Sequence, residues 1–213
     1  MCNRITLTLP DAATLLALFG MEDDEAFRAD YGPRYNIAPT QEHWLVTPAL
    51  PLRFLRVPWG LGPQRHLNTR VETLGVRGFH PGEVPCAVPA DGFLEWEGEE
   101  KDRRPVHFQR ADGEPFMLAG VYDGAGFTVL TTSPDAVVGT VHDRMPVLLE
   151  RSNWRPWLQA RVPRAVEALL GSSAPPALVA RRVSKRINNA AHDDVACLAD
   201  AELPAAPRQL RLL

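Results

Sequence analysis

The second residue of the chain, Cys2, can become a reactive group because it directly follows the initiator Met1. Removal of Met1 leaves an amine and a thiol on neighbouring carbons. Such a 1,2-aminothiol traps an aldehyde: the amine condenses to an imine, and the thiol closes a five-membered thiazolidine in an intramolecular step favoured by proximity. Ordinary pKa values of about 7.7–8.0 for an α-amine and about 8.5 for a thiol put both groups within reach of their nucleophilic forms. The alternative is a frayed, featureless terminus, which is usual for a residue at position 2.

Two further segments combine rigidity or charge with polar side chains. The segment 33–40 is both more rigid and more polar than an ordinary loop. In the segment 68–73, Asn68, Arg70 and Glu72 would share one face of an extended chain, because side chains alternate along a strand. The alternative for Asn68 and Arg70 is a structural role in which they only hold loops in place.

The segments 88–96 and 141–146 carry titratable groups. Alternation along the first predicts that Glu95 lies on the face of Phe93, and a carboxyl beside a ring and away from water has its pKa raised towards neutrality. In the second, the imidazole of His142 stands next to Asp143 and Arg144. The alternatives are an exposed ion pair for Glu95, a capped turn for His142, and a weak surface ion pair between Asp143 and Arg144.

The composition limits the classes of protein to which the chain can belong. The 213 residues are 45% hydrophobic and 23% charged, as in a soluble globular protein, with no composition break that indicates a second domain. We expect a cytoplasmic protein, because the chain has neither an apolar run of membrane-spanning length nor a secretory signal. The three cysteines are widely spaced and the six histidines do not cluster, so reduced thiols and no metal or cofactor are expected. The net charge of −3 requires any phosphate-binding surface to be local.

Hydrophobic periodicity and turn residues predict a single α+β domain over 1–200 with a tail at 201–213, dominated by a mainly antiparallel, curved sheet. Helices are predicted at 11–20, 152–159 and 163–170, and the acidic stretch 22–25 is interpreted as a solvated face. Strands are predicted at 43–47, 53–59, 84–88, 92–96, 106–109, 116–122, 127–131, 146–149 and 178–184. Hairpin turns are predicted at 111–114 and 123–126.

Taken together, five motifs resemble the SRAP family (SOS-response-associated peptidases). In chain order they are Met1-Cys2-x-Arg4, Arg34-Tyr35-Asn36-x-Ala38-Pro39, Asn68-x-Arg70-x-Glu72-Thr73, Pro89-Ala90-Asp91-Gly92-Phe93-x-Glu95-Trp96 and His142-Asp143-Arg144-Met145-Pro146. The resemblance extends from residue 1 to residue 199 or so. It implies a compact domain with flanking helices around a curved, barrel-like sheet.

The resemblance also implies an activity. Members of the family act as abasic-site sensors that form covalent crosslinks with single-stranded DNA during the DNA damage response. Cys2 would be the nucleophile and thiazolidine former, after Met1 is removed by autoproteolysis or by an aminopeptidase. Asn68 would hold the sugar or the imine, and Glu95 would shuttle protons during ring opening, imine formation and release. His142 would bind the opened sugar and assist ring opening.

The expected partner is single-stranded DNA that contains an abasic site, bound by a monomer without metal, cofactor or membrane. Phosphate contacts are expected from basic and loop residues, and base stacking from a tryptophan. The residues expected at the DNA are Arg4, Arg34, Asn36, Pro39, Trp59, Arg70 and Trp96. We expect the protein in the bacterial cytoplasm, associated with the nucleoid when it is bound to damaged DNA.

The chain departs from the family pattern at Asn3, where glycine is usual, and in the short segments 60–67 and 74–85, which thin the expected DNA-binding surface. Three other interpretations remain open at this point. An N-terminal-nucleophile amidohydrolase would also expose Cys2 after processing. In a non-catalytic module that binds single-stranded DNA, Cys2 would be incidental. A degenerate family member would keep the fold with a weakened DNA surface.

Overall fold

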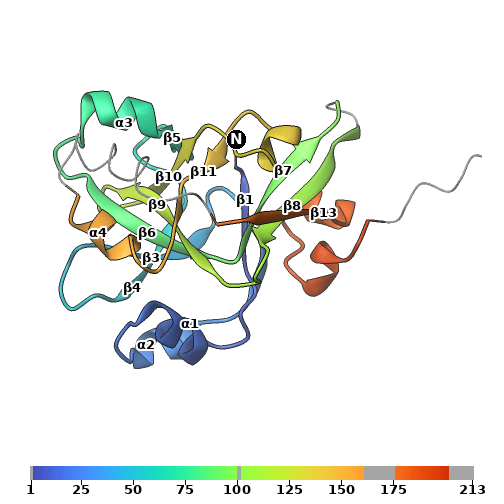
Figure 1. Ribbon diagram of the computed structural model, residues 1–213. Helices are drawn as coiled ribbons and strands as arrows, with labels where there is room; N and C mark the ends of the chain where they lie inside the picture. The colour runs from blue at the N-terminus through green and yellow to red at the C-terminus, as the bar shows by residue number, and fades with distance from the viewer. Residues whose placement is uncertain (1, 100–101, 161–175, 202–213) are drawn as a thin grey trace, which may run out of the picture.

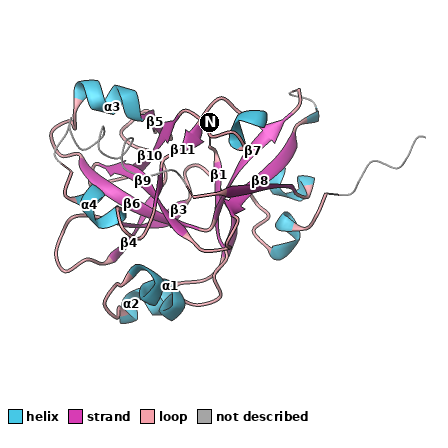
Figure 2. Ribbon diagram, viewed as in Figure 1, coloured by secondary structure: helices cyan, strands magenta, loops and turns pink. Residues whose placement is uncertain are grey.

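Two β-sheets occupy the centre of the molecule, and the helices lie around them (Figures 1 and 2). The computed structural model describes residues 2–99, 102–160 and 176–201. The first sheet has the order β13-β8-β7-β1-β2 and all its pairs are antiparallel. Its strands are β1 (Arg4–Leu7), β2 (Arg34–Ile37), β7 (Gly92–Glu97), β8 (Arg104–Arg110) and β13 (Leu178–Arg182).

The second sheet has the order β11-β10-β9-β6-β3-β4, with β12 paired to β9 and β5 paired to β10. The β5–β10 pair is parallel, and the other pairs of this sheet are antiparallel. Its strands are β3 (Glu42–Val46), β4 (Phe54–Pro58), β5 (Asn68–Arg70), β6 (Val84–Ala90), β9 (Phe116–Tyr122), β10 (Phe127–Thr132), β11 (Met145–Pro146) and β12 (Leu148–Leu149). The two sheets do not close into a barrel.

Short helices connect and cover the strands. The α-helices are α1 (Ala12–Phe19), α2 (Glu25–Asp30), α3 (Val71–Arg77) and α4 (Trp154–Leu158). The 3-10 helices named in the described part of the chain are η2 (Val138–Thr140), η3 (Lys185–Asn188) and η4 (Val195–Leu198). Among the residues described, no helix combines the length and the apolarity that a membrane crossing needs.

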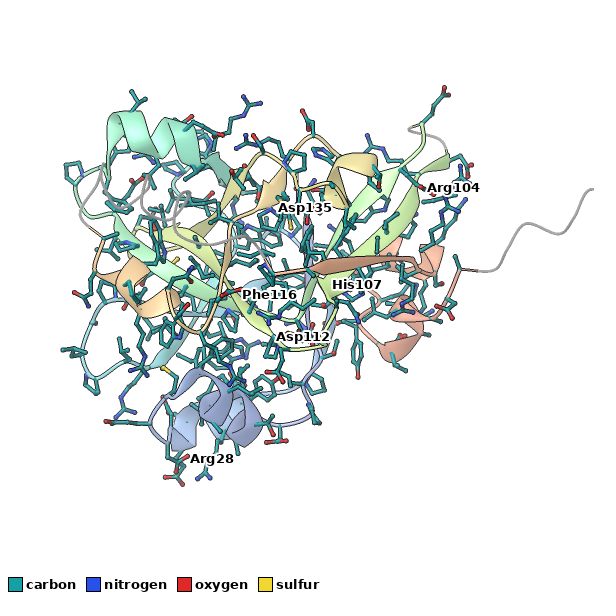
Figure 3. The ribbon with its side chains drawn as sticks, in the orientation of Figure 1. Arg28, Arg104, His107, Asp112, Phe116 and Asp135 are labelled. Atoms are coloured by element: carbon teal, nitrogen blue, oxygen red, sulfur yellow. The ribbon has the colours of Figure 1, made fainter. Side chains whose placement is uncertain are left out.

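The chain passes from one sheet to the other at Asp91, the single residue between β6 and β7. Its carboxylate accepts hydrogen bonds from the hydroxyls of Thr6 and Thr8, both at 2.6 Å. At the next residue, Gly92, a Cβ atom would lie 2.0 Å from Nε2 of His107, an interior residue of β8 (Figure 3). The corner therefore requires glycine at 92 because the imidazole occupies the space of any side chain.

Strand β7 is buried on both faces, which places Glu95 in the interior. Phe93 belongs to the main core and stacks on Phe108, with ring centroids 5.2 Å apart. Leu94 points to the other face, into a small cluster with Val183, Ile187 and Cys197 that η3 and η4 cover. Because side chains alternate along a strand, Glu95 lies on the face of Phe93, as the sequence predicts.

The α+β class and the mainly antiparallel pairing are confirmed. Helix α1 begins after its predicted start, where Asp11 caps it by accepting from the Thr14 N–H. The hairpin at 123–126 is confirmed, because β9 and β10 pair on either side of it. The hairpin at 111–114 is wrong: the turn joins β8 to β9, which belong to different sheets. The segment predicted as one strand at 146–149 is divided between β11 and β12.

Three other segments differ from their predictions. The rigid loop at 33–40 contains strand β2, and the acidic stretch is not simply solvated, since Asp24 is buried and accepts from the Phe27 N–H at the start of α2. The extended segment from Asn68 ends at Arg70, where α3 begins. The predicted helix at 163–170 lies outside the described residues.

Candidate active site at the N-terminus

Cys2 lies between the two sheets at the start of β1, beside the ends of β5 and β7 (Figure 1). Its side chain has no exposed surface, and Sγ donates to the carbonyl oxygen of Arg4 at 3.5 Å. Burial raises the pKa of the thiol strongly, and the charge of Glu95 raises it further. While Met1 is attached, the buried Cys2 thiol is therefore harder to ionise than an ordinary cysteine.

Glu95 is the buried carboxyl of the site. Its residue exposure is 2%. Burial raises its pKa to about 7, against the opposing charge of the N-terminal amine. This agrees with the prediction from the alternation of β7. A carboxyl with a pKa near neutrality exchanges protons in both directions at physiological pH, which suits general acid–base chemistry.

His142 faces this carboxyl from the segment between η2 and β11. Its Nε2 atom lies 4.0 Å from Oε2 of Glu95. Its Nδ1 atom accepts the backbone N–H of Arg144 at 3.0 Å, so the neutral ring carries its proton on Nε2, towards Glu95. Burial lowers the pKa of His142, while the Asp143 carboxylate, 3.0 Å from Nδ1, opposes this shift.

Asn68 fixes the backbone of Cys2. Its Nδ2 atom donates to the Cys2 carbonyl oxygen at 2.9 Å. Strand β5 holds Asn68 in place through parallel pairing with β10, where Val129 lies opposite Asn68. The contact is with the protein main chain, which adds a positioning role to the sugar-holding role that the resemblance implies.

Glu72 does not share a face with Asn68, because the chain enters α3 after Arg70. The prediction of one polar face over 68–72 is wrong for this reason. Both carboxylate oxygens of Glu72 instead accept from the guanidinium of Arg144, at 2.9 Å each. Arg144 therefore does not form the surface ion pair with Asp143 that the sequence left open.

Three residues expected at the DNA have structural roles instead. Trp59 is completely buried, donates from Nε1 to the Leu67 carbonyl at 2.8 Å and lies parallel to Phe127, so its ring offers no surface to a base. Arg34 forms an ion pair with Asp193. The third residue, Asn36, has no exposed surface and donates to the carbonyl oxygens of Ile187, Asn189 and His192.

The other expected DNA-binding residues keep accessible surface. The guanidinium of Arg4 lies 5.8 Å from the ring centroid of the half-buried Trp96, whose Nε1 donates to Asn188 at 2.7 Å. Arg70 is exposed and Pro39 is half-buried. Arg70 also lines an open depression of about 560 Å³ beside Asn68, together with Arg77, His66 and His80.

Sequence reasoning missed two basic residues near the site. Arg144 appeared only as the neighbour of His142, and its partner Glu72 is 72 residues away in the chain. Arg103, exposed and directly before β8, lowers the pKa of His142 through its charge. Over 2–99, 102–160 and 176–201, no group of three or more His, Cys, Asp and Glu side chains is arranged to hold a metal ion.

Comparison with known proteins identifies the family. The family model described as SOS response associated peptidase (SRAP) matches residues 1–190. This chain belongs to the SRAP family. It is 28% identical to abasic site processing protein YoqW of Bacillus subtilis, over 89% of this chain and 95% of that protein. It is 30% identical to abasic site processing protein YedK of Escherichia coli, over 76% of this chain and 81% of that protein.

Solved structures share the SRAP fold seen here. A protein from Bacteroides thetaiotaomicron superposes with a TM-score of 0.77 at 20% identity, over 94% of this chain and 100% of its own. A phage-related protein from Bordetella bronchiseptica gives 0.68 at 26% identity, over 86% of this chain and 95% of its own. The arrangement of two sheets around the N-terminus is thus shared by proteins of low sequence identity.

Proposed function

We propose that this protein processes abasic sites in DNA by covalent capture: after Met1 is removed, Cys2 reacts with the ring-opened sugar aldehyde in single-stranded DNA. The observation that carries the proposal is the convergence of three side chains from distant segments on Cys2 at the N-terminus. Asn68 holds the Cys2 carbonyl at 2.9 Å, the charge of Glu95 acts on the Cys2 thiol, and His142 lies 4.0 Å from Glu95. The relatives named as abasic site processing proteins support the same activity.

Ring opening comes first, because an abasic sugar is mainly a closed hemiacetal without a free aldehyde. Opening requires removal of the proton from the C1′ hydroxyl and donation of a proton to the ring oxygen. Glu95, with a pKa of about 7, takes the first proton and then returns it to the ring oxygen, while the neutral His142 can donate a hydrogen bond from Nε2 to the opening sugar. Glu95 thus acts first as general base and then as general acid, and His142 acts as a hydrogen-bond donor.

Capture follows in two bond-forming steps. The α-amine of Cys2 adds to C1′, and loss of one water, with the proton supplied by Glu95, gives the imine. The thiol Sγ then adds to the same carbon, its proton passes to the nitrogen, and the thiazolidine closes. The product has the mass of protein plus DNA minus one water. In this order the amine attacks first, and the tethered thiol adds only once the imine has formed.

The direction of the thiol pKa favours this proposal over the amidohydrolase alternative. A cysteine hydrolase needs its thiolate as the first nucleophile and therefore lowers the pKa of that cysteine. In this site burial and the charge of Glu95 raise the pKa of Cys2. The aldehyde trap tolerates a protonated thiol, because the tethered thiol reacts only after the imine has formed.

DNA would contact surfaces on both sides of the buried nucleophile. Arg4 and Trp96 offer a cation and an aromatic face on the β7 side, and Arg70 with its depression lies on the β5 side. Contacts of this kind bind phosphates and stack on bases with little sequence preference. Attraction to DNA would depend on Arg4 and Arg70, because the net charge of −3 gives no attraction over the whole molecule.

Intact-mass measurement tests the proposal. The purified protein is weighed alone and after incubation with single-stranded DNA that contains one abasic site, with the same DNA carrying a tetrahydrofuran analogue as a control without an aldehyde. We expect loss of Met1 and an adduct of protein plus DNA minus one water. Cys2→Ala abolishes the adduct, whereas Cys86→Ala, at a second fully buried cysteine, retains it. An adduct in Cys2→Ala, or none in the processed wild type, contradicts the proposal.

A chain extended before Met1 tests the α-amine. Acylation turns the nitrogen of Cys2 into an amide without nucleophilicity, so an extension that resists processing is expected to prevent capture. A heat-stable adduct of the unprocessed chain would show that the amine is not involved. Turnover of a chromogenic amide by the processed chain, without DNA, would instead favour the amidohydrolase.

A further inference from the structure

Arg144 lies behind the proposed site and is 8% exposed. Its guanidinium joins helix α3 to the second sheet: both oxygens of Glu72 accept from it at 2.9 Å, and the Thr131 carbonyl accepts at 2.5 Å. Its backbone N–H donates to Nδ1 of His142 at 3.0 Å. One residue therefore contacts the start of α3, the end of β10 and the imidazole that faces Glu95.

These contacts connect the elements that carry Asn68 and His142. Glu72 lies in the first turn of α3, which directly follows β5 and its Asn68. Thr131 of β10 pairs with Arg70 of β5. The segment 142–144 has little regular structure of its own, being bends and coil between η2 and β11. The Arg144 side chain ties the segment to α3 and β10, in addition to the hydrogen bond from the His142 N–H to the Val138 carbonyl and the pairing of β11 with β10.

The geometry requires arginine and a carboxylate. The planar guanidinium presents parallel N–H groups that match both oxygens of a carboxylate, whereas a lysine ammonium does not make this paired contact. The hydrogen bond from Arg144 lowers the pKa of Glu72, so the pair is charged at neutral pH. Glu72 keeps a half-exposed side chain, at 52%, and can be altered without emptying the core.

We propose that the Glu72–Arg144 ion pair is a positioning device for the abasic-site reaction, holding the 142–144 segment so that Nε2 of His142 keeps its proton and faces Glu95. This inference rests on the proposed function. Neither side chain touches the reacting atoms: Glu72 acts on Arg144, and Arg144 acts on the orientation and tautomer of His142. The device therefore sets the rate of capture and leaves the binding of DNA unchanged.

The first test is Glu72→Gln, which keeps the shape and one acceptor but removes the charge. At saturating abasic-site DNA we expect the rate constant of crosslinking to fall on the order of tenfold, because small displacements of a catalytic group are costly. The Kd for tetrahydrofuran-containing DNA should change by less than about twofold, since uniform binding is untouched. Glu114→Gln is the matched control: it breaks the exposed pair of Glu114 with Arg151, 2.7 Å apart, and should have the wild-type rate.

A weaker Kd with an unchanged rate constant at saturation would overturn the proposal, because the pair would then serve DNA binding.

A double variant tests whether the Glu72–Arg144 pair acts through His142 or independently of it. In a His142→Ala background, Glu72→Gln should lower the crosslinking rate constant by a much smaller factor than it does in the wild type. A residue that acts through another loses its effect when that other is removed. If Glu72→Gln lowers the crosslinking rate by the same factor in that background, the proposal is overturned as well.

The nitrogen chemical shifts of His142 provide a readout without catalysis. In ¹⁵N spectra, the wild type should show a protonated Nε2 and an unprotonated Nδ1, and Glu72→Gln should show averaging of the two tautomers. Unchanged shifts in a folded Glu72→Gln protein would overturn the proposal. Because this measurement needs no DNA, it decides on the positioning device even if the wild-type protein forms no crosslink, which would refute the proposed function alone.

Discussion

Glu95 and His142 face each other across the proposed site, with Oε2 and Nε2 4.0 Å apart. Glu95 lies on β7 of the first sheet, and His142 lies in the segment before β11 of the second sheet. Burial raises the pKa of the carboxyl to about 7 and lowers that of the imidazole. The carboxyl therefore exchanges protons near neutral pH, which is the condition for acid–base catalysis, and the imidazole beside it is neutral.

Replacing the carboxyl tests its role in proton transfer. Glu95→Gln is expected to slow crosslinking by about 100-fold at pH 7, within the range that a positioned general acid or base contributes. The wild-type rate should change around pH 7, where Glu95 titrates, and the variant should lose this inflection. Single-turnover rates from pH 5.5 to 8.5 or so cover the range in which such a group titrates. Glu97→Gln, on the same strand but paired with Arg182, is the control and should keep the wild-type profile.

The same carboxyl should affect stability with a definite sign. Its pKa is raised from the ordinary value of 4.5 to about 7, so the unfolded chain loses this proton at lower pH than the folded chain does. The contribution of Glu95 to stability is thus full below pH 4.5 and is lost as pH rises through 7. At 1.36 kcal/mol per pKa unit, the loss is on the order of 3 kcal/mol.

Chemical unfolding of Glu95→Gln measures this effect. The variant should be more stable than the wild type at pH 8, because burial of a neutral amide does not require a charge to be desolvated. The difference in unfolding free energy should shrink as the pH approaches 5. A variant that is less stable than the wild type at pH 8 would show that ionised Glu95 has stabilising partners in the fold.

The hydrogen bond from Asn68 to the Cys2 carbonyl should matter for orientation more than for binding. Asn68→Asp keeps the size of the side chain but removes the donor, and is expected to slow capture on the order of tenfold, as misplacement of a nucleophile does. The affinity of the variant for lesion-free DNA should fall only by the amount that the added negative charge explains. The neighbouring Thr69→Val removes a contact with Thr128 at 3.2 Å and serves as control. Equal rates for both variants would argue against the positioning of Cys2 by Asn68.

The corner between the sheets should be sensitive to one methyl group. In Gly92→Ala the new Cβ would lie 2.0 Å from Nε2 of His107, so the imidazole or the strand must move. Overpacking of this kind costs about 1–3 kcal/mol of unfolding free energy. Gly32→Ala, where nothing lies within 4 Å of the added Cβ, should leave the free energy almost unchanged. Denaturant unfolding compares the two, and equal midpoints would contradict the fit of His107 at the corner.

Local sequence patterns determined the strands and the chemical groups of the site. Alternation located β3, β4, β6, β7, β8, β9, β10 and β13 within a few residues, and it placed Glu95 on the face of Phe93. The position of Cys2 behind Met1 supplied the aminothiol. These inferences succeed because side-chain period and covalent neighbours are properties of a short stretch of chain.

Only the tertiary structure decided which polar residues meet and which are buried. It placed Trp59 in the core, bound Arg34 and Asn36 to the 187–193 loop, and raised the pKa of Cys2 through burial beside Glu95. It also paired Arg144 with Glu72, 72 residues away, where the sequence suggested its neighbour Asp143. The physical reason is that desolvation and ion pairing depend on atoms brought together by folding, and local periodicity carries no information about those partners.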